Sequence, residues 1–320
     1  MQTKKEINMP SKRVIFFGTP EIGASVLHAL LESGVEIVGV VTRQDKPMGR
    51  KHEISISAVK RLATESNIEI FQPASPKEII KNIEELKPDL IVTCAYGCIL
   101  PSSLLSIPTF GCINVHTSLL PRWRGGAPIH RAIMAGDEKT GVTIMYMEKG
   151  LDTGNIILQQ EVVIEENETY DTLYKKLSEA SYKLVKENIS SLFSKDVKSQ
   201  KQDSALVTQA KVITPEEESI DWKEGTARGV HNKIRGLNSI PLAHTTLNGK
   251  VVKLFESVLT GIGSKEKPGT IISVSKKGIE VSTTDLNLLL TKIQIAGKKP
   301  VSVEQMVNGN HAFKVGDMFL

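Results

Sequence analysis

Short apolar runs alternate with amphipathic stretches over the first two thirds of the chain. Three runs of mainly β-branched and apolar residues predict buried strands at Val14–Phe17, Ile37–Val41 and Leu90–Cys94. Apolar residues at helical spacing predict helices at Glu21–Glu32, Ser57–Glu65, Pro76–Leu86 and Thr169–Phe193. Ser57 and Ser75 stand where helix N-caps are expected. The alternation is typical of βαβ units, so we expect a Rossmann-like α/β domain with a parallel sheet.

The pattern changes near residue 200. Residues 194–212 are polar and poor in large apolar side chains, as expected of a linker between compact units. Short alternating runs follow, at Val251–Phe255, Gly269–Val274, Ile279–Ser282 and Leu286–Ile293. Turn-forming residues separate them, which predicts a small β-barrel or sandwich, and of the two we expect an OB-like β-barrel. We therefore expect a disordered tail at residues 1–12, an α/β domain at 13–200, a linker at 201–210 and a β-barrel domain at 211–320.

Charge and cysteine usage narrow the class of protein. Residues 205–320 carry 15 Lys and Arg against 11 Asp and Glu, whereas residues 1–204 carry 25 of each. This excess fits contact with a polyanion, although an ordinary solvated surface would also account for it. Cys94, Cys98 and Cys112 lack the spacing of metal ligands and predict reduced thiols in a cytoplasmic protein without a metal site. No apolar run is long enough to predict a membrane span, so we expect no membrane association.

The segment Gly111–Ile129 carries the most informative chemistry. Gly111–Val115 predicts a strand, and residues two apart on a strand point the same way, so Asn114 and His116 share a face. An amide and an imidazole side by side can donate to an oxygen that becomes negative during acyl transfer. Asp152, in a loop bounded by glycines, is the best candidate for a carboxylate that orients the histidine. A strand-end pair that satisfies backbone groups, with Asp152 serving the turn, is the alternative.

Several motifs together resemble the 10-formyltetrahydrofolate-dependent formyltransferases, and most of all the branch that acts on methionyl-tRNA. They are GCINVHTSLLPRWRGGAPI from Gly111, GVTIMYMEKGLDTGN from Gly141, FFGTPEIGASVLHALL from Phe16, DKPMGR from Asp45, FQPASP from Phe71, AYGCILP from Ala95, IDW from Ile220, KIRGLN from Lys233 and IQIAGKKP from Ile293. Their order and spacing also match. The turn after the first strand lacks the G-x-G-x-x-G spacing, so NAD is not expected.

The resemblance implies a function and a set of site residues. It implies transfer of a formyl group from 10-formyltetrahydrofolate to the free amino group of methionyl initiator tRNA, by attack of the amine on the formyl carbon with oxyanion stabilisation. Asn114, His116 and Asp152 would form the catalytic trio. The folate would bind at Ser118, Leu119, Leu120, Pro121, Tyr96, Gly97, Ile99 and Val142. Catalysis would belong to residues 13–200 and tRNA binding to residues 211–320, in a monomer.

Basic and aromatic residues implied to contact tRNA fall into three groups. They are Arg50 and Lys51 in one loop, Arg122, Trp123 and Arg124 beside the trio, and Lys233, Arg235, Lys250 and Lys253 in the second domain. Each group has a plainer interpretation as a solvated charged surface, and Trp123 as a core anchor. Arg43-Gln44 and Asn238-Ser239-Ile240-Pro241 depart from the usual family pattern, which leaves contacts there open.

Two other functions compete with this expectation. A formyltransferase that modifies an amino nucleotide sugar would carry the same trio. A catalytically silent RNA-binding homologue would need neither the amide nor the imidazole, so the intact trio counts against it. Glycinamide ribonucleotide formyltransferases lack a counterpart of residues 210–320.

Overall fold

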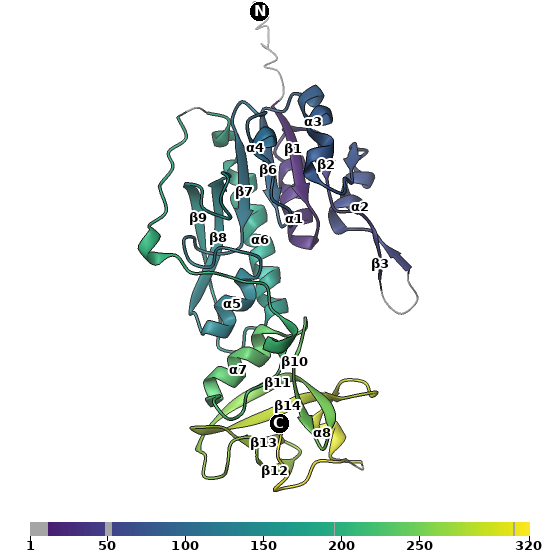
Figure 1. Cartoon of the computed structure of the whole chain (residues 1–320), viewed down its shortest axis with the longest axis vertical. Coiled ribbons are helices and arrows are strands. Elements are labelled where there is room, and N and C mark those ends of the chain that lie inside the picture. The colour runs from purple at the N-terminus through teal and green to yellow at the C-terminus, as the bar shows by residue number, and fades with distance from the viewer. Residues whose placement is uncertain (1–11, 49–52, 195, 310) are drawn as a thin grey trace, which may run out of the picture. The chain divides into compact units, whose positions relative to one another are not determined.

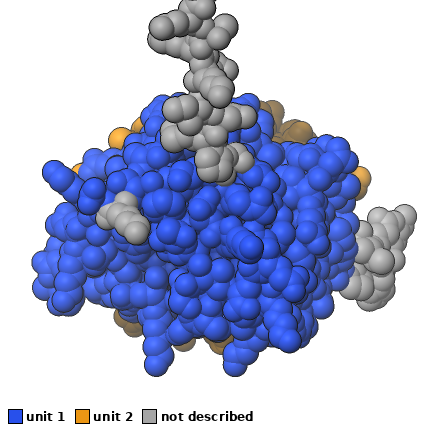
Figure 2. Space-filling model, turned by 90° about the horizontal axis from the view of Figure 1, so that it is seen from above, with its two compact units in different colours: residues 1–125, 141–162, 175–209 blue, residues 126–140, 163–174, 210–320 orange. Residues whose placement is uncertain are grey.

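The computed structural model describes residues 12–48, 53–194, 196–309 and 311–320, and Figure 1 shows its helices and strands. The chain forms two compact units that interleave along the sequence. The first comprises residues up to 125 together with 141–162 and 175–209, and the second comprises 126–140, 163–174 and 210–320; Figure 2 colours them separately. The predicted division into a catalytic region at 13–200 and an RNA-binding region at 211–320 stays a prediction.

A seven-stranded sheet organises the first unit, in the order β5-β2-β1-β6-β7-β8-β9. Its strands are β1 (Arg13–Gly18), β2 (Glu36–Val41), β5 (Ile70–Phe71), β6 (Leu90–Cys94), β7 (Cys112–His116), β8 (Lys139–Tyr146) and β9 (Ile156–Val163). The five strands from β5 to β7 are parallel, and β8 runs antiparallel to β7. Residues 14–17 of β1 are fully buried, as expected for a strand covered on both faces.

Helices begin and end close to where the apolar spacing placed them. They are α1 (Glu21–Leu31), α2 (Ala58–Glu65), α3 (Ile80–Leu86), α4 (Ser102–Leu105) and α6 (Tyr170–Asn188), with 3₁₀ turns at Pro76–Ile79 before α3 and at Ile189–Leu192 after α6. Ser57 accepts a hydrogen bond from the Lys60 N–H, and Ser75 accepts one from the Lys77 N–H. Both predicted N-caps are therefore confirmed.

The second unit is built on antiparallel strands. Its strands are β10 (Ala243–Leu247), β11 (Lys250–Gly263), β12 (Ile271–Ser275), β13 (Gly278–Ser282), β14 (Leu286–Ile295) and β15 (Val301–Ser302), and its helices are α5 (Pro128–Ala135), α7 (Ala227–Gly236) and α8 (Val303–Met306). The sheet order is β10-β11-β14-β13-β12, with β15 paired to β14. Trp222 stacks on Phe319 within the apolar core, and its indole N–H donates to the Thr245 hydroxyl at 2.9 Å.

The last residues of the chain connect the two ends of this sheet. Beside β12, the Phe319 N–H donates to the Gly269 carbonyl and the Ile271 N–H to the Asp317 carbonyl. Beside β10, Leu320 and Thr246 exchange two backbone hydrogen bonds. The carboxyl-terminal segment therefore pairs with both edges, which removes open strand edges as a barrel does. The prediction of a parallel α/β domain followed by a small β domain is confirmed.

A small antiparallel hairpin, β3 (Lys46–Met48) with β4 (Glu53–Ser55), lies in the first unit. Asp45 at its root forms an ion pair with Lys60, and the Lys60 ammonium also donates to Gln72 at 2.7 Å. The hydrogen bonds that the Asp45 carboxylate accepts from Lys60 and from the Gln72 NH₂ group hold the pKa of Asp45 below its ordinary value. Arg50 and Lys51, predicted to contact tRNA, lie outside the described residues.

Candidate active site

Strand β7 carries Asn114 and His116 to the carboxyl end of the parallel sheet. Asn114 lies opposite Thr93 of β6 on one side and Met145 of β8 on the other, and His116 lies opposite Thr143. The carboxyl ends of strands are where open α/β sheets bind ligands. The predicted strand is therefore confirmed, and His116 is its last residue rather than the first residue beyond it.

Asp152 lies in the turn between β8 and β9 and points at both residues. One carboxylate oxygen is 3.5 Å from the Asn114 side-chain nitrogen, and the other is 3.7 Å from Nδ1 of His116. The His116 and Asp152 side chains are only 7% and 11% exposed, so water screens the pair weakly. The second oxygen also accepts the Gly125 N–H at 2.9 Å. The structure thus brings the three predicted residues together.

The turn that carries Asp152 needs an unusual backbone. Asp152 itself has a φ of 52°, in the left-handed region that few residues other than glycine adopt readily. At Gly154, an added Cβ would lie 1.8 Å from the Tyr146 carbonyl oxygen, so only glycine fits. The glycine therefore lets the turn fold back against the end of β8 and brings Asp152 over the end of β7.

The second ring nitrogen of His116 faces a backbone acceptor. Nε2 lies 2.9 Å from the Trp123 carbonyl oxygen. A carbonyl only accepts, so Nε2 must carry a hydrogen and donate it. Nδ1 faces the Asp152 carboxylate, which is also an acceptor when ionised. Each ring nitrogen of His116 therefore faces an acceptor, the Trp123 carbonyl at Nε2 and the Asp152 carboxylate at Nδ1.

Thr93, which the sequence analysis overlooked, orients Asn114. Its buried hydroxyl donates to the Asn114 side-chain oxygen at 2.7 Å. The ionised Asp152 carboxylate only accepts, so the end of the Asn114 amide that faces it is the NH₂ group, and the end at Thr93 is the oxygen. Asn114 and His116 thus direct N–H groups at one acceptor. The signal was available in principle, because Thr93 is the last residue but one of β6, the strand next to β7.

The residues predicted to bind folate are of two kinds. Ser118, Leu120, Tyr96 and Val142 have buried side chains. Leu119 and Pro121 are half-buried, whereas Gly97 is exposed and Ile99 is 72% exposed. Tyr96 packs edge-on against Phe17, and burial raises its pKa to about 12, so its phenol stays neutral. In this conformation, only the half-buried and exposed residues of the set present side-chain or Cα atoms to solvent.

The basic and aromatic residues in the loop after β7 differ in their exposure and contacts. Arg122 is exposed, with its guanidinium 4.4 Å from the centre of the Trp123 ring. Arg124 is half-buried, and its guanidinium donates twice to Gln202, at 2.9 and 2.8 Å. Trp123 has a φ of 66° and supplies the carbonyl that meets His116. Arg122 is therefore the better placed of the two arginines for an external partner.

Of the predicted contacts in the second unit, one is not supported. Arg235 is 7% exposed, and its guanidinium donates to Asn232 and to the carbonyls of Glu165 and Glu168. Arg235 lies on the buried face of α7, where its guanidinium is hydrogen-bonded within the protein, so it does not present charge to a partner. Lys250 and Lys253 are exposed on β11, and half-buried Lys233 donates to the Ser219 carbonyl.

Metal-binding clusters and cysteines offer no second site for chemistry among the described residues. No three or more His, Cys, Asp and Glu side chains gather there in a way that would hold a metal ion. Cys94 and Cys112 are buried free thiols, and burial raises the pKa of each to about 12, so neither is a ready nucleophile. None of the described helices is long and apolar enough to span a bilayer.

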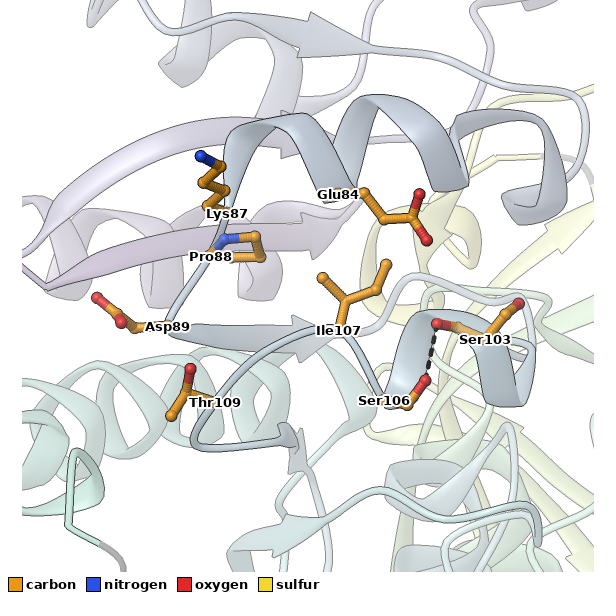
Figure 3. Close-up of a pocket in the computed structure, with 8 residues that line it drawn as sticks. All are labelled: Glu84, Lys87, Pro88, Asp89, Ser103, Ser106, Ile107 and Thr109. Atoms are coloured by element: carbon orange, nitrogen blue, oxygen red, sulfur yellow. Dashed lines mark hydrogen bonds between the residues drawn. The ribbon is translucent and has the colours of Figure 1, made fainter.

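A polar cavity of about 500 Å³ lies away from the trio (Figure 3). It is lined by Glu84, Lys87, Pro88, Asp89, Ser103, Ser106, Ile107 and Thr109. Asp89 directly precedes β6, so the cavity lies at the amino end of the parallel strands. Ligands of such sheets bind at the opposite end. The trio therefore lies at the end of the sheet where such ligands bind, and this cavity does not.

Comparisons with known proteins point to one family. The family model described as formyl transferase matches residues 12–189, and that of the formyl transferase carboxyl-terminal domain matches residues 212–311. Methionyl-tRNA formyltransferase of Malacoplasma penetrans is 44% identical over 98% of both chains, and that of Bacillus subtilis is 45% identical over 96% of this chain and 97% of its own. An N-formyltransferase from Helicobacter canadensis, solved with folinic acid and dTDP-3-aminofucose, is 20% identical with a TM-score of 0.67, over 88% of this chain and 98% of that one. At that identity, the solved structure supports the fold alone.

Proposed function

The chain belongs to the methionyl-tRNA formyltransferase family, and on that premise we propose that it transfers a formyl group from 10-formyltetrahydrofolate to the amino group of methionyl initiator tRNA. The observation that carries this proposal is the convergence of two N–H donors, from Asn114 and His116, on Asp152. Formyl transfer to an amine is an acyl transfer, and its tetrahedral intermediate carries a negative oxygen that needs such donors.

The proposed reaction begins when the neutral amine of the methionyl group attacks the formyl carbon. A C–N bond forms, and the carbonyl oxygen becomes negative. Asn114 donates to that oxygen through its NH₂ group, and protonated His116 donates through Nδ1, the two donors that face Asp152. The Asp152 carboxylate lies 3.7 Å from Nδ1, where it balances the charge of the ring and leaves the N–H for the substrate oxygen, while the Trp123 carbonyl accepts from the other ring nitrogen.

Collapse of the intermediate breaks the bond between the formyl carbon and N10 of the folate. The amine nitrogen loses one proton and N10 gains one, so the net exchange is a formyl group for a proton. Asp152 and His116 are the groups near the reacting atoms through which this proton can pass. No metal or redox step is needed in this scheme.

We propose that the folate is bound by the segments around the trio. Gly97 and Ile99 offer exposed surface beside the carboxyl end of β6, and Leu119 and Pro121 offer half-buried surface beyond β7. A flat heterocycle binds well in an apolar slot edged by backbone groups. The buried members of the predicted set, Ser118, Leu120, Tyr96 and Val142, would then support the walls of this slot.

For the tRNA, we propose contacts from exposed cations. Arg122 is stacked with Trp123 beside the trio, and Lys250 and Lys253 are exposed on the second unit. We include Arg50 and Lys51 in this set on the basis of their sequence motif alone.

We assign catalysis to residues 13–200 and tRNA binding to 211–320, with 201–210 joining them. The chain would act as a monomer in the cytoplasm, where charged tRNA is found.

The test is to incubate the full chain with 10-formyltetrahydrofolate and charged initiator tRNA, and to look for formyl-methionine after release from the tRNA. The proposal predicts formyl-methionyl-tRNA that depends on both substrates. Formate without tRNA, or modification of an amino nucleotide sugar in place of the tRNA, would contradict it.

A further inference from the structure

Gln202 lies between two loops of the candidate active site, although it belongs to a segment whose composition predicted a linker. Its side chain is buried, at 7% exposure. Its NH₂ group donates to the carbonyl of Asp152 at 2.9 Å and to the carbonyl of Gly154 at 2.7 Å. Its oxygen accepts two hydrogen bonds from the Arg124 guanidinium. The Gln202 amide thus joins the turn that carries Asp152 to the loop that follows β7.

The orientation of this amide is determined by its partners. Arginine only donates, so the atom facing Arg124 must be the oxygen. Backbone carbonyls only accept, so the atom facing Asp152 and Gly154 must be the nitrogen. All four contacts are therefore compatible with a single orientation, and a carboxylate in place of the amide would lose the two that hold the turn.

The turn needs such support from outside. Asp152 adopts a positive φ, and residues held in sparsely populated conformations persist only when surrounding groups fix them. Gln202 binds the backbone of Asp152 itself and of Gly154, two residues on. Loss of these two bonds would let the turn relax and move the carboxylate relative to Asn114 and His116.

The same segment fixes the other acceptor of His116. Thr208 accepts the Trp123 N–H on its hydroxyl at 2.8 Å and the Arg124 N–H on its carbonyl at 2.9 Å. The Trp123 carbonyl in turn faces Nε2 of His116. Residues 202–208 therefore hold both groups that face the imidazole, one on each side of the ring.

We propose that Gln202 is a positioning residue for formyl transfer, acting through the backbone of the Asp152 turn. This inference rests on the function proposed above. Since misplacement of catalytic groups by about 1 Å can cost about 100-fold in rate, we expect loss of the Gln202 donors to lower kcat by about 10-fold to 100-fold. KM for the tRNA and for the folate should change little, because the side chain of Gln202 contacts neither the exposed cations proposed to bind tRNA nor the segments proposed to bind folate.

The experiment compares two substitutions of Gln202 with a matched control in the full chain. Gln202→Glu keeps the size and the acceptor for Arg124 but places a carboxylate against two carbonyl oxygens. Gln202→Met keeps the approximate size and removes all four hydrogen bonds. Gln200→Met is the control, because Gln200 pairs with Ile156 through its backbone and exposes its side chain. Thermal unfolding of each variant checks that the chain is folded at the assay temperature.

Single-turnover formylation, followed for hours so that slow variants remain measurable, gives the rates. Both Gln202 variants should be slow and the control should match the wild type. In an Asp152→Asn background the effect of Gln202→Glu should shrink, because a residue that acts through Asp152 cannot act fully without it. A wild-type rate in folded Gln202→Glu, or an undiminished effect in the Asp152→Asn background, would overturn the inference. A wild-type chain that makes no formyl-methionine would instead overturn the proposed function.

Discussion

A methyl group added at Gly154 should disable the site from two residues away. The new Cβ would lie 1.8 Å from the Tyr146 carbonyl oxygen and 2.8 Å from its carbon. Atoms in favourable contact lie about 3.5 Å apart, so the turn would have to move by about 1.7 Å. Asp152 would move with it, because both residues belong to the same tight turn. We expect Gly154→Ala to lower the single-turnover rate by about 100-fold or more, and stability by about 1–3 kcal/mol.

Formylation of initiator tRNA and thermal unfolding, measured on the same preparations, test this expectation. Gly263→Ala is the matched control, since a Cβ there would meet no atom within 4 Å. It should leave both the rate and the unfolding midpoint near wild type. If folded Gly154→Ala reacts at the wild-type rate, the position of the Asp152 turn does not govern the chemistry, and the role given to Asp152 is wrong.

Three further outcomes follow from the same contacts. Thr93→Val should slow formylation by about fivefold to tenfold, because it loses the hydrogen bond that orients Asn114, whereas Thr93→Ser should react near the wild-type rate. Equal rates in the wild type and both variants would refute the role of Thr93. Arg131 lowers the pKa of Glu217 from 4.5 to about 2, so the stability from this ion pair is present above pH 4.5 and is lost as the pH falls toward 2. In thermal melts, the free energy of unfolding of Glu217→Gln should be about 1 kcal/mol below that of the wild type at pH 7, after allowance for solvent screening, and this difference should disappear at acid pH. A difference that does not change with pH would contradict the direction of the Glu217 pKa shift. Lys253→Gln should weaken tRNA binding and lower the slope of log affinity against log salt by about 1, and an unchanged slope would remove Lys253 from the tRNA surface.

Much of the fold could be predicted because burial leaves a periodic signal in the sequence. A strand covered on both faces, such as β1, must be apolar along its length, and an N-cap such as Ser57 must have a side chain that can accept a backbone N–H. The interleaving of the two units could not be predicted. Residues 126–140 and 163–174 belong to the second unit, and no change of composition marks where they leave the first.

The candidate site was predictable where strand geometry governs it. Asn114 and His116 share a face because they are two apart on one strand, and Asp152 was suggested by the glycines around it. Gln202 and Thr208 gave no such signal, since a polar segment has the same composition whether it is solvated or packed against a site. For the same reason, a positive charge in the sequence did not distinguish the buried Arg235 from the exposed Lys253.

The central claim is that paired N–H donors stabilise a negative oxygen during formyl transfer. The most direct measurement is the single-turnover formylation rate of Asn114→Ala, which removes one donor from a half-buried position. We predict a rate lower by about 10² to 10³, with an unfolding midpoint close to wild type. A near-wild-type rate in this variant would contradict the claim.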